Sequence, residues 1–299
     1  MNVSDMEYKT VGNSDLTIST VSFGCMSLNP DEGLNSERVI QRAVDQGINF
    51  FDTADLYDKG RNEEMLGKAL RGRREEVVIA TKVGNRWRED GTGWEWTPRK
   101  EYILSAVEES LKRLQTDRID LLQLHGGTID DPLDEVVEAF EALQKQGKIR
   151  YYGISSIRPN VIREYVRRSS IATVMMQYSL LDRRPEESCL ELLRKAGVGV
   201  LARGTLAKGL LADKPAKEYL GYSEEEVKGL QEELLETGKP IAAALQFVRS
   251  HDAVSSAVAG IRTEKQLDEV LKSAQQSLSG ERMDGITKRL SPRLYEKHR

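Results

Sequence analysis

Short apolar runs alternate with amphipathic segments along almost the whole chain, and this alternation restricts the folds open to it. Five of the runs end in a single polar residue, and these residues are Asp52, Lys82, His125, Ser155 and Gln177. Parallel strands that are covered on both faces read as short apolar runs. Their alternation with helices favours a parallel sheet covered by helices, with the polar residues at the strand ends.

Eight strand–helix units follow one another. We expect strands at 21–23, 48–52, 77–82, 121–125, 149–155, 173–177, 199–202 and 255–259. We expect helices at 36–46, 62–70, 99–114, 133–146, 159–168, 186–196, 240–250 and 263–274. Ser36 is the expected N-cap of the first helix. Eight units in one series, without a Pro- or Gly-rich linker, favour an α/β fold of the closed (β/α)8 TIM-barrel type over an open doubly wound sheet.

A β-hairpin is expected before the barrel. Residues 7–11 and 16–19 read as its strands, with a Gly/Asn turn between them. The hairpin could close the bottom of the barrel or form an ordinary edge. We therefore expect a single domain over residues 1–299, with the hairpin in 1–20, the barrel in 21–275 and a short polar C-terminal tail in 276–299.

Composition argues against several classes of partner and compartment. A net charge of −4 gives no electrostatic support for binding to nucleic acid or to an anionic membrane. Residues 1–9 are polar, so no secretory signal is expected, and no run approaches the ~18 apolar residues of a spanning helix. The two cysteines, Cys25 and Cys189, form no disulfide framework, which favours a cytoplasmic location. The histidines lack metal-ligand spacing, so no metal is expected.

The polar strand ends predict acid–base chemistry. Barrel closure would bring Asp52, Lys82 and His125 together, because they end three consecutive strands. Tyr57 follows in a short loop that would fold its phenol over the same strand ends. A free phenol has a pKa of about 10, and an adjacent ammonium lowers that pKa by about 1–3 units. Such a site would protonate a carbonyl oxygen while a nucleophile attacks the carbonyl carbon. A bound hydride donor could supply that nucleophile.

The chain resembles the aldo-keto reductases along nearly its whole length. The resemblance rests on five motifs in order, which are Phe50–Tyr57, Ala80–Val83, Leu124–His125, Gly147–Ser155 and Gln177–Ser179. It implies reduction of aldehydes or ketones by NADPH. In this resemblance Tyr57 is the general acid and His125 orients the carbonyl group. Lys82 and Asp52 form the pair that tunes the acid.

The resemblance also implies where the NADPH cofactor would bind. Ser155 and Gln177 would hydrogen-bond the nicotinamide carboxamide. No G-x-G-x-x-G motif follows a strand, so the phosphates are expected at the loops after strands 7 and 8 instead of at a Rossmann site. The residues assigned to the cofactor are Gly24, Ser155, Gln177, Arg203, Gly204, Leu206, Gly209, Gly260, Arg262, Gln266 and Glu269.

The loop after strand 8 carries an anion-binding signal. Thr263 and Gln266 form a T-x-x-Q capping box, so Gly260 and Arg262 would lie at a helix N-terminus, which attracts anions. Arg262 suits the extra 2′-phosphate of NADP better than the hydroxyl of NAD.

Several positions depart from the family pattern. Arg203 stands where many relatives place an aromatic residue against the nicotinamide, Ser156 where Asn is frequent, and Val270 where Asn contacts adenine. Gly126 and Gly127 replace bulkier groups and would widen the substrate mouth. The three tryptophans, at 87, 94 and 96, all follow strand 3, where they either wall the substrate pocket or pin a long loop.

Two other functions stay open at this point. A strand-end lysine beside a tyrosine is also the arrangement of a Schiff-base aldolase or dehydratase, in which Lys82 would react covalently. Some barrels of this family act as cofactor-bound sensors or partner subunits. Beyond a small-molecule carbonyl, neither the substrate nor the oligomeric state can be read from the sequence.

Overall fold

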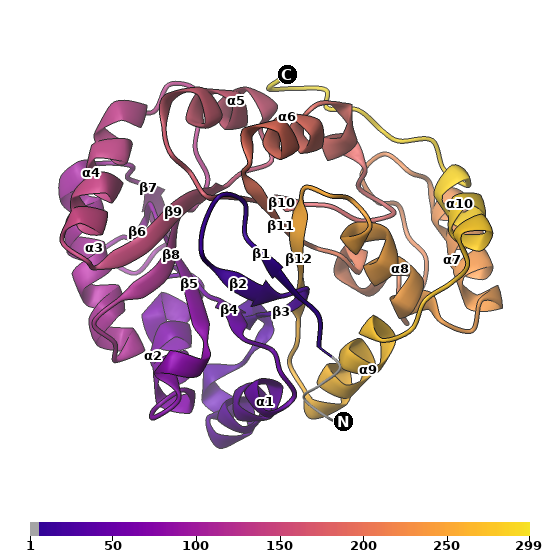
Figure 1. Ribbon diagram of the computed structural model, residues 1–299, viewed down its shortest axis with the longest axis horizontal. Coiled ribbons are helices and arrows are strands. Elements are labelled where there is room, and N and C mark those ends of the chain that lie inside the picture. Colours follow the sequence, from indigo (N-terminus) through magenta and orange to yellow (C-terminus); the bar gives the residue numbers. More distant parts are fainter. Residues whose placement is uncertain (1–5) are drawn as a thin grey trace.

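Eight parallel strands close into a barrel at the centre of the molecule (Figure 1). The structure is a computed structural model that describes residues 6–299. The barrel strands are β3 (Val21–Gly24), β4 (Phe50–Asp52), β5 (Val78–Val83), β8 (Ile119–Leu124), β9 (Ile149–Ser155), β10 (Thr173–Gln177), β11 (Gly199–Arg203) and β12 (Val254–Gly260). Each pairs with two neighbours, in the order β10-β11-β12-β3-β4-β5-β8-β9. The prediction of a (β/α)8 barrel is confirmed.

Helices surround the barrel, each burying one apolar stripe against it (Figure 1). Those that follow the strands are α1 (Leu34–Asp45), α2 (Arg61–Ala69), α3 (Lys100–Leu114), α4 (Leu133–Lys145), α5 (Pro159–Arg168), α6 (Cys189–Ala196), α8 (Pro240–Arg249) and α9 (Glu264–Ala274). In α1 the stripe is Val39, Ile40, Ala43 and Val44. The spacing of these apolar residues is what predicted the helix.

The expected N-cap of α1 is wrong. The helix starts earlier, at Leu34, and Gly33 occupies the cap position. Ser36 is buried inside the first turn, where its Oγ donates to the backbone carbonyl of Asn29 at 3.0 Å. The preceding residues, Pro30–Glu32, form a short 3-10 turn that leads directly into the helix. Ser36 is therefore already inside the helix and cannot act as its N-cap.

The N-terminal hairpin closes one end of the barrel. Its strands, β1 (Tyr8–Thr10) and β2 (Thr17–Ser19), lie across the barrel centre in Figure 1. Val11, Leu16 and Ile18 are buried in one cluster with residues from inside the barrel. The hairpin therefore plugs the N-terminal ends of the strands. Residues 1–5 of the expected hairpin segment lie outside the described residues.

The two-residue period of the strands decides which side chains face the barrel interior. The cluster inside the barrel contains Phe50, Ala80, Leu121, Met175 and Leu201. Two positions further along the same strands come Asp52, Lys82, Gln123, Gln177 and Arg203. These polar side chains therefore face inward, at the end of the barrel opposite the hairpin.

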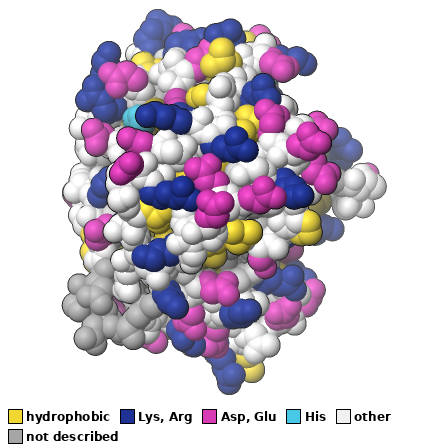
Figure 2. Space-filling view, turned by 90° about the vertical axis from the view of Figure 1, so that its right-hand side faces the viewer, with side chains coloured by type: hydrophobic (Ala, Val, Ile, Leu, Met, Phe, Trp, Pro, Cys, Tyr) yellow, Lys and Arg dark blue, Asp and Glu magenta, His cyan; other side chains and the backbone are white. Residues whose placement is uncertain are grey.

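Four further elements have no counterpart among the predicted ones. They are a hairpin of β6 (Asn85–Trp87) and β7 (Trp94–Trp96), and two helices, α7 (Glu224–Glu236) and α10 (Gly280–Lys288). The helix α10 lies in the expected tail, beside α7, and buries two of its apolar side chains (Figure 1). On the face shown in Figure 2, acidic and basic side chains are interspersed and hydrophobic ones are scattered. Within residues 6–299, no helix is long and apolar enough to cross a bilayer.

Candidate functional site

Lys82 lies at the centre of the candidate site, with three oxygen atoms around its ammonium group. Its Nζ is 2.6 Å from Oδ2 of Asp52, 2.7 Å from the carbonyl oxygen of Thr53 and 3.3 Å from the hydroxyl of Tyr57. An ammonium has three N–H donors, so each contact takes one of them. The Tyr57 oxygen therefore accepts a hydrogen bond from Lys82, and the proton of Tyr57 itself remains free for another acceptor.

The barrel holds Asp52 and Lys82 as a buried pair. Asp52 ends β4, and Lys82 lies on the adjacent strand β5. Gln123 of β8 donates from Nε2 to Oδ1 of Asp52 at 3.2 Å, so both carboxylate oxygens have a donor. Burial opposes the charge on Lys82, but the Asp52 carboxylate and Tyr57 outweigh it and raise the pKa of Lys82 above its usual value. Lys82 is therefore held as an ammonium.

The loop after β4 positions Tyr57. Thr53 donates from Oγ1 to Asn62 Oδ1 at 2.7 Å, which fastens the start of the loop to α2. Trp87 donates from its indole Nε1 to the carbonyl oxygen of Leu56 at 3.1 Å, which fastens the other side to the β6–β7 hairpin. The phenol of Tyr57 therefore has a defined place over the strand ends.

His125 follows β8 and faces the Tyr57 ring. The two rings meet edge to face, with centroids 5.7 Å apart. Burial, with the positive charges of Lys82 and Arg203, lowers the pKa of His125 to about 3, so the imidazole is neutral. Its Nδ1 is buried and has no hydrogen-bond partner among residues 6–299. An unpaired buried N–H is costly, so we place the proton on Nε2.

Gly24 lies between the candidate catalytic residue Asp52 and the expected cofactor residue Gly260. In the strand ladders it pairs with Asp52 on one side and with Gly260 on the other. A Cβ atom at Gly260 would lie 2.8 Å from Oγ of Ser27. One at Gly24 would lie 3.2 Å from the carbonyl oxygen of Ala259. Larger residues would crowd this edge, so both positions need a glycine to keep the backbone closely packed.

The N-terminus of α9 carries the expected anion-binding residues. Thr263 caps the helix by accepting the N–H of Gln266 at 3.2 Å. The expected capping box is incomplete, because Oε1 of Gln266 accepts from the N–H of Arg262 at 2.9 Å instead of from Thr263. The guanidinium of Arg262 pairs with Glu32 at 3.0 Å. Glu269 lies one turn further along α9.

Gln177 and Arg203 are adjacent at the ends of β10 and β11. Nη1 of Arg203 donates to Oε1 of Gln177 at 3.2 Å, and Nε2 of Gln177 donates to the hydroxyl of Tyr219 at 2.9 Å. Both ends of the Gln177 amide therefore have a partner. A Cβ at Gly204 would lie 3.2 Å from Cγ of Gln177, and Gly204 has a φ of +66°. Ser155 ends the neighbouring strand β9.

A tight turn follows β11 and contains Leu206 and Gly209, the two remaining residues expected to contact the cofactor. The N–H of Ala207 donates to the carbonyl of Gly204 at 2.9 Å, and the N–H of Gly209 to that of Leu206 at 2.8 Å. Gly209 has a φ of +94°, which glycine adopts without strain. Leu206 is partly buried against the main core. The turn therefore lies beside Gln177, and the structure brings the expected residues after β11 to the same barrel end as the catalytic candidates.

The sequence motifs do not predict a role for two buried polar residues near the site, Gln123 and Asp55. Gln123 supports Asp52, and the signal for it was a polar residue inside an otherwise apolar strand. Asp55 is part of the loop that carries Tyr57, and its Oδ2 accepts a hydrogen bond from the hydroxyl of Tyr102 at 3.3 Å. Burial, and then the neighbouring Glu63, raises the pKa of Asp55 to about 8, so this carboxyl is neutral at pH 7.

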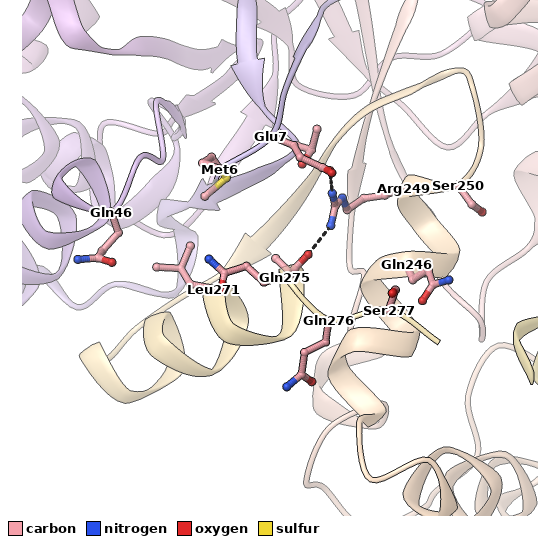
Figure 3. A pocket seen from close by; sticks show the side chains of 12 residues that line it. Met6, Glu7, Gln46, Gln246, Arg249, Ser250, Leu271, Gln275, Gln276 and Ser277 are labelled. Atoms are coloured by element: carbon pink, nitrogen blue, oxygen red, sulfur yellow. Dashed lines mark hydrogen bonds and ion pairs between the residues drawn. The ribbon is translucent and has the colours of Figure 1, made fainter. Parts of the chain in front are cut away.

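A cavity of about 600 Å³ lies at the other end of the barrel (Figure 3). Arg249 reaches across it, donating to the carbonyl of Ala274 and pairing with Glu7. Its lining comes mainly from the segment before β1, from Thr20 before β3, and from the C-terminal parts of α8 and α9 with the residues after them, so the cavity is remote from the strand ends that carry Lys82. Within residues 6–299, no group of three or more His, Cys, Asp or Glu side chains is arranged to hold a metal ion.

A closed (β/α)8 barrel with buried acid–base residues at the C-terminal ends of its strands is the architecture of a barrel enzyme. The family model described as Aldo/keto reductase family matches residues 20–290. The chain belongs to the aldo-keto reductase family, and it is an oxidoreductase. The resemblance inferred from its motifs is confirmed at this level.

Curated relatives and solved structures agree with this assignment. The chain is 46% identical to the uncharacterized oxidoreductase YqkF of Bacillus subtilis, over 98% of this chain and 100% of that protein. It is 32% identical to the aldo-keto reductase yakc [NADP(+)] of Schizosaccharomyces pombe, over 68% of this chain and 62% of that protein. The holo form of aldo-keto reductase AKR11C1 from Bacillus halodurans matches with a TM-score of 0.94 and 49% identity, covering 98% of this chain and 99% of that one.

Proposed function

We propose that the protein reduces aldehydes or ketones to alcohols with NADPH, and that Tyr57 is the general acid. The observation that carries the proposal is the use of all three Lys82 donors, one of them on the Tyr57 oxygen. This arrangement leaves the phenol proton free and places a cation beside the phenolate that its loss would create.

The residues at the strand ends fit a nicotinamide dinucleotide. Gly24 and Gly260 form an edge that a side chain would crowd, and Arg262 lies at the capped N-terminus of α9, where anions are favoured. Gln177 and Ser155 would hold the carboxamide. When bound, the cofactor would supply the hydride. The relative yakc carries NADP(+) in its name, which supports NADPH as the form used.

Tyr57 and His125 would act together on the carbonyl oxygen. As this oxygen becomes negative, Tyr57 would give it a proton, and Lys82 would stabilise the remaining phenolate at the 3.3 Å contact. The neutral imidazole of His125 would donate from Nε2 to the same oxygen and orient the substrate. Asp52 keeps the Lys82 ammonium in place.

A Tyr57→Phe variant tests the proposal. The loss of one hydroxyl should lower kcat by about 10²–10⁴-fold, while the dissociation constant for NADPH stays unchanged. Tyr165→Phe is the matched control, because the hydroxyl of Tyr165 is buried on α5 without a partner among the described residues. Unchanged turnover in Tyr57→Phe would contradict the role of Tyr57.

The Schiff-base alternative has less support. A lysine that attacks a carbonyl must be a neutral amine, whereas Lys82 has a raised pKa and three oxygen acceptors. Borohydride trapping with substrate should therefore leave no adduct on Lys82. The sensor alternative would require cofactor binding without turnover. A cytoplasmic location remains part of the proposal, supported by two buried, unpaired cysteines among residues 6–299.

A further inference from the structure

The cation expected to meet the 2′-phosphate of NADPH already has an anionic partner. Nη2 of Arg262 donates to Oε1 of Glu32 at 3.0 Å. Glu32 lies in the loop after β3, and Arg262 in the loop after β12. These strands are neighbours in the closed barrel, with Gly24 opposite Gly260, so closure brings together two residues that are 230 positions apart.

The loop that carries Glu32 is fastened at several points. Nδ2 of Asn29 donates to Oε1 of Glu32 at 3.3 Å, and the carbonyl of Asn29 accepts from Ser36 of α1. Asp31 pairs with Arg61 at the start of α2. The hydrogen bonds from Arg262 and Asn29 lower the pKa of Glu32, so it stays ionised at neutral pH. The carboxylate is therefore a persistent neighbour of Arg262.

A carboxylate and a guanidinium at this place have opposite preferences for the two nicotinamide cofactors. A carboxylate can accept the 2′-hydroxyl of an NAD ribose and repels a phosphate, whereas an arginine accommodates the 2′-phosphate of NADP. We propose that Glu32 is a specificity residue, whose carboxylate competes with the 2′-phosphate for Arg262 and so narrows the preference for NADPH over NADH. This inference rests on the proposed function, because it takes Arg262 as the 2′-phosphate site.

Calorimetric titration with NADP⁺ and with NAD⁺ tests the inference without turnover. Glu32→Gln should bind NADP⁺ about three- to fivefold more tightly, which is the range expected for removing one exposed charge pair. Its affinity for NAD⁺ should stay the same or fall. The gain for NADP⁺ should shrink at high salt, because the competition is between exposed charges.

Asp31→Asn is the matched control. It removes the same charge from the same loop, but from a residue whose partner is Arg61. The ratio of the NADP⁺ and NAD⁺ affinities should not change in this variant. Equal tightening in Glu32→Gln and Asp31→Asn would overturn the inference, because it would reflect overall charge. A parallel change for both cofactors in Glu32→Gln would also overturn it.

Arg262→Ala separates failure of the inference from failure of the proposed function. This variant should weaken NADP⁺ binding much more than NAD⁺ binding. If it does so and Glu32→Gln changes nothing, the inference is wrong and the placement of the cofactor stands. If the wild-type protein binds NADP⁺ and Arg262→Ala binds it equally well, the cofactor placement itself is wrong.

Discussion

At the scale of single residues, the hydrogen bonds of the Lys82 ammonium define the candidate site. Each of its three donors has an oxygen acceptor, and Asp52 has a second donor in Gln123. A buried lysine is rarely found without such partners. The ammonium donates to the phenolic oxygen of Tyr57 and also lies 5.0 Å from the centroid of the Tyr57 ring. Lys82 and Asp52 are therefore positioned to stabilise a phenolate and to leave the proton of Tyr57 for a substrate.

His125 is expected to make stability depend on pH in the acidic range. Its pKa is about 3 in the folded protein, against about 6.5 in an unfolded chain. Between these values the unfolded chain binds more protons, so the free energy of unfolding falls as the pH falls, by up to ~1.4 kcal/mol per unit. Above about 6.5 this contribution is fully present.

A comparison with His125→Gln isolates this effect. Urea unfolding of the wild type and the variant at about pH 7, 6 and 5 gives the difference in their unfolding free energies at each pH. As the pH falls, the unfolding free energy of the wild type should fall relative to that of the variant, because only the wild type carries the buried imidazole. A difference that stays constant over this range would show that His125 is not held neutral by burial.

At the scale of elements, the β6–β7 hairpin connects the loops that carry the candidate catalytic residues. Trp87 donates to the loop of Tyr57, and Trp96 donates from Nε1 to Asp131 in the loop after β8 at 2.9 Å. Trp94 is half exposed. These contacts favour the role of pins for Trp87 and Trp96. The hairpin thereby joins two loops of the candidate site that are not adjacent in sequence.

Packing of Trp96 on the backbone makes one glycine irreplaceable. A Cβ at Gly84 would lie 2.7 Å from the Trp96 ring, and Gly84 has a φ of +124°. Gly84→Ala should therefore lower the free energy of unfolding by about 2–4 kcal/mol, from overpacking and backbone strain together. Gly93→Ala, with a φ of +149° but open space around it, reports the backbone strain alone. Equal losses for the two variants in denaturant titrations would mean that the Trp96 contact contributes nothing.

At the scale of the whole molecule, the two ends of the barrel have different tasks. The C-terminal ends of the strands carry Lys82 and the residues expected to bind the cofactor. The N-terminal ends hold the hairpin plug and a buried ion-pair network around Asp120. This carboxylate accepts from Arg74 at 2.7 Å, from Arg150 at 3.2 Å and from the N–H of Ile79 at 2.9 Å. The network joins three neighbouring strands and has no contact with the site.

Removal of the Asp120 carboxylate should therefore affect stability and not catalysis. Asp120→Ala removes the buried carboxylate that pairs with three arginines, so the free energy of unfolding should fall by about 3 kcal/mol. The kcat of the folded variant should equal that of the wild type. Asp117→Ala, at an exposed carboxylate, should cost less than about 0.5 kcal/mol. A large loss of kcat in Asp120→Ala would show that the two ends of the barrel are coupled.

The strands and long helices could be predicted because their signals are local. Residues 159–168 and 173–177 form an element each with the expected bounds, since a run of apolar residues at the right period identifies both. The helix α10 has no such signal because it buries only Met283 and Ile286, and the β6–β7 hairpin has none because its strands are three residues long and bury only Asn85. Ser36 was misassigned because a serine at a helix start can turn inward when the preceding turn already supplies the helix entry.

The sequence by itself determined the barrel and its polar strand ends. Both follow from the alternation of short apolar runs with amphipathic segments. Only the tertiary structure decided which polar groups meet. The support of Asp52 by Gln123, the contact of Gln177 with Tyr219, and the pairing of Glu32 with Arg262 all join distant segments. Such pairs depend on barrel closure and on side-chain direction, and neither leaves a periodic signal in the chain.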